Sequence, residues 1–239
     1  MMRSLIEVDE IIQILISVVA ISFAFTLVFA EAGGLVESPR DFTVFMILSL
    51  ITVGSGFILH EMSHKLTAIY YGAYARFRMW KQGIIFMLVV SLFGVLFAAP
   101  GAVYIYAKHI TRKQNGIISI AGPAMNLILV AFFLILQFVY PVDIYFSFLY
   151  GIRILGVESG AINVWLFGAM INLILGLFNM IPAFPLDGSK VLYWNKGVWL
   201  AATFGMLVIG YMLGLGAGFI VMWGVLLMLA LFFSKMLFG

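Results

Sequence analysis

The sequence predicts an all-α polytopic membrane protein, with six transmembrane helices and a membrane-entering segment that is re-entrant or forms a β-hairpin. Its composition is 64% hydrophobic and 10% charged, whereas soluble domains are about 45–50% apolar and about 25% charged. Apolar stretches recur that are long enough to cross about 30 Å of hydrocarbon as helices. Because no repeat or polar linker divides the chain, we expect one domain over residues 1–239.

Six apolar stretches are expected to form the transmembrane helices. They occupy residues 11–30, 42–68, 117–138, 161–181, 198–213 and 219–233. The last two are short for a membrane span. We expect the first helix to remain in the mature protein, because Glu7, Asp9 and Glu10 are unlike the basic start of a signal peptide and the apolar run is too long for one.

The chain contains no cysteine, which excludes disulfides, cysteine-bound zinc and thiol catalysis. Histidines and carboxylates are therefore the strong metal ligands that remain. The formal net charge is +3, and no run of basic residues with interleaved aromatics indicates a nucleic-acid partner. The expected surroundings are the lipid bilayer.

An H-E-x-x-H motif ends the second apolar stretch, formed by His60, Glu61 and His64. Residues four apart on a helix lie on one face, so the two imidazoles can bind a single Zn²⁺ while Glu61 activates water as general base. A merely structural origin is disfavoured, because ionisable groups inside a membrane segment cost roughly 2.5–3.5 kcal/mol each.

Two histidines need at least one further protein ligand. His109 lies in a charged stretch and fits a solvated surface residue, whereas Asp187 follows a helix that Pro182 and Pro185 must interrupt. Broken backbone at membrane depth is tolerated where it lines a wet cavity, and Gly188 permits a tight turn after the carboxylate. The alternative is that this segment only caps a helix at the interface.

Three motifs together resemble the site-2 protease family of intramembrane zinc metalloproteases. They are HEMSH, then Gly122-Pro123 with Asn126, then NMIPAFPLDG, and the resemblance extends from residue 57 to the C-terminus. It implies that His60, His64 and Asp187 bind zinc and that Glu61 is the general base. Ser63 and Ser189 stand where the family often has glycine, and the PDZ domain of many relatives is not found, so that a minimal core is expected.

The resemblance implies a zinc-dependent endopeptidase that hydrolyses peptide bonds of transmembrane substrate helices, in regulated intramembrane proteolysis. Asn126 and Asn179 are candidates for substrate binding or carbonyl stabilisation, because a buried amide in lipid needs a partner. The alternative is that both asparagines only join helices.

The ligands constrain the membrane topology, because the chain must cross an even number of times between His64 and Asp187. Two predicted helices supply two crossings, so residues 83–106 must contribute none or two. Pro100-Gly101 interrupts this stretch, and basic residues flank both its ends. We therefore expect a re-entrant segment whose second arm, residues 101–106 (GAVYIY), is a strand. Its edge could pair with an unwound substrate backbone.

This topology places most basic residues on the side of the H-E-x-x-H motif and an acidic excess on the other. The positive-inside rule then predicts a multi-pass protein of the cell membrane with its active site and both termini in the cytoplasm. Two other functions are considered: a membrane-anchored zinc peptidase acting on soluble or unfolded chains, and a non-proteolytic metal-binding or transport protein. The first would need a sizeable aqueous domain around the site, and no polar stretch of this sequence is long enough to form one. Transporters usually place several polar ligands along a path through the membrane, whereas this chain concentrates them in one cluster. The sequence makes no prediction of the oligomeric state.

Overall fold

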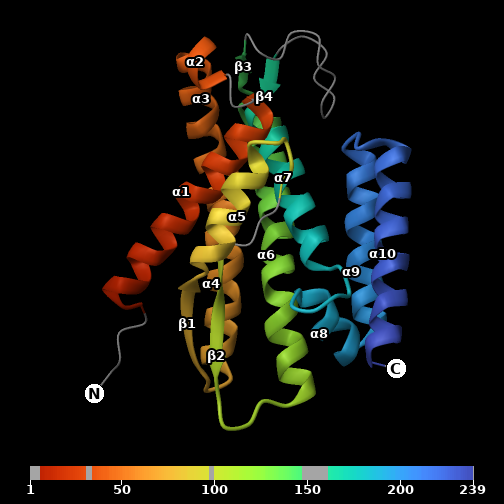
Figure 1. Cartoon of the computed structure of the whole chain (residues 1–239). Coiled ribbons are helices and arrows are strands. Elements are labelled where there is room, and N and C mark those ends of the chain that lie inside the picture. The colour runs from red at the N-terminus through yellow and green to blue at the C-terminus, as the bar shows by residue number, and fades with distance from the viewer. Residues whose placement is uncertain (1–5, 31–33, 97–99, 147–160, 239) are drawn as a thin grey trace.

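The computed structural model describes residues 6–30, 34–96, 100–146 and 161–238, which form a bundle of helices with two small sheets (Figure 1). The elements are α1 (Val8–Ala30), α2 (Gly34–Glu37), α3 (Pro39–Ser49), the π-helix η1 (Leu50–Gly54), α4 (Ser55–Tyr70), β1 (Tyr74–Met79), α5 (Lys81–Ser91), β2 (Gly101–Tyr106), α6 (Arg112–Val139), β3 (Asp143–Tyr145), β4 (Ala161–Asn163), α7 (Val164–Asn179), α8 (Asp187–Trp194), α9 (Lys196–Met212) and α10 (Gly216–Phe238).

Helices are present at all six ranges predicted to span the membrane. Three are long and apolar enough to do so: α1, the continuous 32-residue helix formed by α3, η1 and α4, and α6. The apolar helices α7, α9 and α10 are shorter over their described residues. The prediction of an integral, largely helical membrane protein is confirmed, while the number of crossings stays a prediction.

The segment predicted to be re-entrant or a β-hairpin contains the predicted strand and also a helix. The predicted strand at Gly101–Tyr106 is present as β2, but its antiparallel partner is β1, which lies upstream of the predicted segment. The helix α5 occupies most of the intervening stretch, because an uninterrupted apolar run can pack as a helix against α1. The two ends meet, since the Trp80 N–H donates a 3.0 Å hydrogen bond to the Pro100 carbonyl. The two ends of this stretch therefore lie side by side, while its re-entry into the membrane stays a prediction.

Polar side chains on one face of α1 cover the outer edge of β1. Glu10 Oε1 accepts the Phe77 N–H at 2.9 Å, and Gln13 Oε1 accepts the Met79 N–H at 3.1 Å. Glu10 also forms a buried 2.5 Å ion pair with Lys65 of α4. An uncovered strand edge invites pairing with another chain. Because α1 covers β1, the edge of this sheet that remains for pairing is that of β2.

The helix α6 lies at the centre of the bundle and packs against α4, α7 and α8 (Figure 1). Its start is fixed by a capping box, in which Thr111 and Gln114 satisfy each other's backbone N–H groups. Close approach to α8 requires Gly116, because a Cβ there would collide with the Trp194 side chain. This packing brings α6 and α8 against the face of α4 that carries the H-E-x-x-H motif.

Candidate active site

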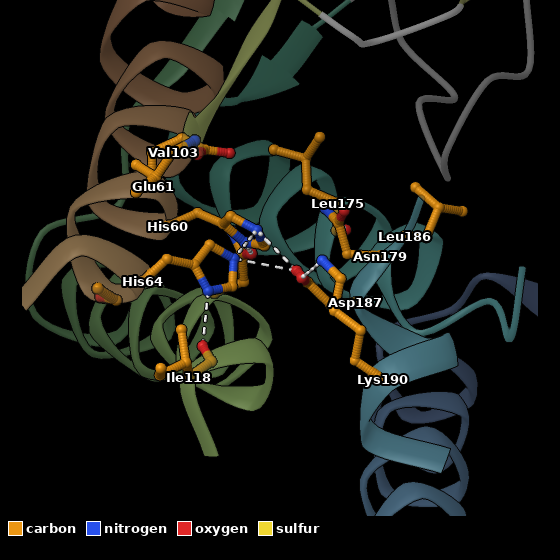
Figure 2. Close-up of polar contacts among 12 residues, drawn as sticks. His60, Glu61, His64, Val103, Ile118, Leu175, Asn179, Leu186, Asp187 and Lys190 are labelled. Atoms are coloured by element: carbon orange, nitrogen blue, oxygen red, sulfur yellow. Dashed lines mark hydrogen bonds and ion pairs between the residues drawn. The ribbon is translucent and has the colours of Figure 1, made fainter. Parts of the chain in front are cut away.

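Three buried side chains that were predicted as ligands converge between α4 and α8 (Figure 2). The Nε2 atoms of His60 and His64 are 3.0 Å apart. Asp187 Oδ2 lies 3.4 Å from the Nε2 of His60 and 3.0 Å from that of His64. One helical turn separates the histidines, so both rings leave the same face of α4.

The backbone between α7 and α8 delivers Asp187 to the histidines. Helix α7 ends at Asn179 and α8 begins at Asp187, so the break predicted from Pro182 and Pro185 is present. A Cβ on Gly188 would collide with the carbonyl oxygen of Met180. Glycine at this position therefore lets the first turn of α8 lie directly on the end of α7.

Hydrogen bonds to the rear of each imidazole fix its tautomer. The Nδ1 of His64 lies 2.7 Å from the carbonyl oxygen of Ile118, which can only accept, so this nitrogen carries the proton (Figure 2). The Nδ1 of His60 lies 2.6 Å from Asn126 Oδ1 and donates to it in the same way. In neutral rings both Nε2 atoms then present lone pairs toward Asp187.

The donor set fits a zinc ion. Two lone-pair nitrogens and a carboxylate oxygen repel one another unless a cation lies between them. Tetrahedral zinc with bonds of about 2.0–2.1 Å separates its ligand atoms by about 3.3 Å, and the three separations here are 3.0, 3.0 and 3.4 Å. The backbone of α6 closes this side at Gly122, where a Cβ would lie 2.5 Å from His60 Nε2. His60, His64 and Asp187 could therefore hold the metal and leave a position open.

Glu61 is the fourth buried ionisable group of the cluster, and it lines the same cavity as the two histidines and Asp187, which has a volume of about 460 Å³. Its Oε2 accepts the backbone N–H of Val103 at 2.9 Å. Strand β2 also lines this cavity along residues Gly101 to Ile105. A carboxylate, a set of metal ligands and a strand edge thus share one space.

The sequence profile of peptidase family M50 matches residues 48–196. The chain belongs to peptidase family M50, the site-2 protease family. A protein of Methanocaldococcus jannaschii, named as a predicted zinc metalloprotease, is 43% identical over 85% of this chain and 93% of its own length. Another from that organism, named a zinc metalloprotease, is 27% identical over 72% of this chain but only 40% of its own length. No solved structure matches.

In this M50 metalloprotease, the asparagines predicted to contact substrate have different surroundings. Asn126 is buried and has both ends of its amide engaged, because its Nδ2 donates to Asn172 Oδ1 at 3.1 Å. Asn179 is half-buried, lines the cavity, and donates to the Leu175 carbonyl at 3.0 Å (Figure 2).

Sequence reasoning missed several groups around the site of the M50 metalloprotease. Lys190 Nζ lies 3.4 Å from Asp187 Oδ1, one turn further along α8 (Figure 2). The spacing of three residues on a helix could have indicated this pair. The Ile118 carbonyl and the Val103 N–H are backbone groups, which no residue type marks. Asn172 is fully buried between helices, and its amide was a signal that the sequence did offer.

Proposed function

We propose that this metalloprotease is a zinc-dependent intramembrane endopeptidase that hydrolyses peptide bonds in transmembrane substrate segments. His60, His64 and Asp187 would hold the zinc ion, and Glu61 would be the general base. The observation that carries the proposal is the convergence of these four buried side chains on one cavity lined by a strand edge. Membership of family M50 supports the peptidase activity.

Zinc bound at this site would supply a Lewis acid, which polarises a carbonyl oxygen and makes water a nucleophile at neutral pH. Glu61 would take a proton from the attacking water and return it to the leaving amine. The Val103 N–H holds one carboxylate oxygen of Glu61, which leaves its other oxygen for proton transfer. Asp187 is held in turn by Lys190 on the oxygen that faces away from the histidines.

Asn179 is proposed to contact the substrate. Its Nδ2 uses one hydrogen for the Leu175 carbonyl, which leaves a second N–H and the side-chain carbonyl for a ligand. It lies at the end of α7, directly before the broken segment that leads to Asp187. A donor at this position could stabilise the negative charge that develops on the scissile carbonyl oxygen.

The depth of the site supports an intramembrane substrate. His64 and His60 precede the end of α4 at Tyr70 by six and ten residues, which is roughly 9 and 15 Å along a helix. A substrate helix at this depth must expose its peptide groups before hydrolysis, because its own hydrogen bonds occupy them. Pairing with the edge of β2 would hold the unwound segment extended beside Glu61.

The site is proposed to lie toward the cytoplasm. The end of the bundle that carries β1, β2 and the start of α6 also carries a cluster of basic residues, and these belong to the cytoplasmic side under the positive-inside rule. They are Arg76, Arg78, Lys81, Lys108, Arg112 and Lys113.

The substrate class is tested with zinc-loaded protein reconstituted in liposomes and a panel of single-span peptides. Each peptide is paired with a soluble version in which the same cleavable segment is flanked by polar residues. We expect cleavage within the membrane segment, toward its cytoplasmic end, and slower cleavage of the soluble partner. Cleavage confined to the soluble peptides would indicate the membrane-anchored peptidase instead. Zinc binding without any cleavage would indicate a metal-binding protein.

A further inference from the structure

A chain of buried side-chain amides runs from His60 to the π-helix in the same long helix. Asn126 Oδ1 accepts from His60 Nδ1 at 2.6 Å, and Asn126 Nδ2 donates to Asn172 Oδ1 at 3.1 Å. Asn172 Nδ2 donates to two backbone carbonyls, that of Thr52 at 3.2 Å and that of Gly168 at 2.9 Å. Both asparagines are almost wholly inaccessible. The chain thus begins at a proposed metal ligand and ends on backbone.

The direction of every hydrogen bond in this chain follows from its last member. The Thr52 and Gly168 carbonyls have no hydrogen to donate, so the group of Asn172 that faces them must be its NH₂. Its oxygen therefore faces Asn126, which must turn its own NH₂ toward Asn172. The oxygen of Asn126 is then left for His60, whose Nδ1 must carry the proton.

This chain of hydrogen bonds gives His60 the tautomer that metal binding requires. With the proton on Nδ1, a neutral His60 presents an Nε2 lone pair toward His64 and Asp187. If the Asn126 amide were turned by 180°, its NH₂ would face Nδ1 and favour a proton on Nε2, which prevents metal ligation. His64 does not need such a device, because its partner is a backbone carbonyl with a fixed direction.

Close packing of α7 against α4 at Gly56 holds the Asn172 side chain in place. A Cβ on Gly56, one turn before His60, would collide with Asn172 Oδ1. This glycine lets α7 approach α4 closely enough for Asn172 to reach the Thr52 carbonyl. The Thr52 carbonyl also accepts the Ser55 N–H and lies within the π-helix Leu50–Gly54.

We propose that Asn172 is a positioning residue of the metal site, which fixes the tautomer of His60 through the amide of Asn126. The inference rests on the proposed function, because it takes His60 to be a zinc ligand. Outer partners of this kind commonly change metal affinity 10- to 100-fold. A residue that only fills space between α6 and α7 would change zinc affinity through the fold alone.

The test is a double-mutant cycle on zinc affinity, measured in detergent by competition with a chelating dye. Asn172→Leu keeps the branched shape of asparagine but leaves the orientation of the Asn126 amide free, so we expect zinc binding to weaken 10- to 100-fold. In the background Asn126→Asp both oxygens accept and no amide can be reversed. There, adding Asn172→Leu should leave the affinity unchanged or raise it.

The two backgrounds distinguish positioning from packing. An equal loss of affinity on adding Asn172→Leu to wild type and to Asn126→Asp would overturn the proposal, and so would an affinity within twofold of wild type for Asn172→Leu alone. Asn172→Ala, which adds no bulk, repeats the cycle if the leucine variant does not fold, and thermal unfolding of the metal-free proteins reports on the fold. A separate variant tests the proposed function itself. If His60→Ala binds zinc as wild type does, His60 is not a zinc ligand and the proposed function fails, whatever the double-mutant cycle shows about Asn172.

Discussion

The backbone N–H of Val103 donates a 2.9 Å hydrogen bond to the Oε2 of Glu61. In the register of the β1–β2 sheet, Val103 is opposite Phe77, whose N–H points away from β2 to Glu10. In an antiparallel pair of strands, the N–H groups of two directly opposite residues point either both toward each other or both away from each other. Because the Phe77 N–H points away from β2, the Val103 N–H points away from β1 and belongs to the outer edge of β2. The proposed base is therefore attached to the edge on which a substrate segment would pair.

Removing this N–H tests the link between strand and base. Val103→Pro should bind zinc as wild type does but lose at least about tenfold in cleavage rate, because proline is tolerated on an outer edge yet cannot donate. Ile105→Pro is the matched control, since it alters the same edge without removing the hydrogen bond to Glu61. Equal rates for the two variants would show that the contact with Glu61 contributes nothing of its own.

Gly122→Ala tests how closely α6 covers the metal ligands. The added Cβ would lie 2.5 Å from His60 Nε2 and would also collide with His64 Nε2. We expect zinc affinity to fall at least about tenfold, since the ligand atoms must move from their common centre. The control is Gly205→Ala on α9, where a Cβ meets nothing within 4 Å. An alanine at 122 that binds zinc like wild type would contradict the described geometry.

The buried pair of Glu10 and Lys65 predicts a large effect on stability. Glu10→Gln leaves the Lys65 ammonium inside the protein without its counter-ion, and breaking a buried pair in this way costs about 3–5 kcal/mol. The free energy of unfolding in detergent measures it. Replacing both residues with methionine should recover much of the loss. The control is Glu7→Gln, which changes a more exposed carboxylate. If Glu10→Gln lowers the free energy of unfolding no more than Glu7→Gln does, the buried pair of Glu10 and Lys65 is not structurally important.

Topology can be measured directly because the natural chain has no cysteine. Single cysteines at His109, in the loop before α6, and at Glu37, at the opposite end of the bundle, provide one probe for each side (Figure 1). In intact cells a membrane-impermeant maleimide should label Glu37→Cys and spare His109→Cys until the membrane is opened. The reverse pattern would place the active site outside.

The three converging ligands were predicted from the sequence: His60 and His64 from the H-E-x-x-H spacing on a helix, and Asp187 from the proline-broken segment before it together with the resemblance to the site-2 protease family. The sequence also predicted the strand at Gly101–Tyr106. It did not predict β1 as the partner of this strand, since the helix α5 stands between them in the chain. Nor could it pair Asn126 with Asn172. Helices that are apolar on every face have no polar stripe to indicate which sides meet.

The most direct test of the proposed mechanism is the zinc content and cleavage activity of Glu61→Gln beside those of wild type, in the same liposomes. The variant keeps His60, His64 and Asp187 and can still accept the Val103 N–H, but it cannot take a proton from water. We predict about one zinc ion per chain in both proteins and a loss of cleavage by at least about a hundredfold in the variant. Full cleavage activity in Glu61→Gln would contradict the proposed mechanism.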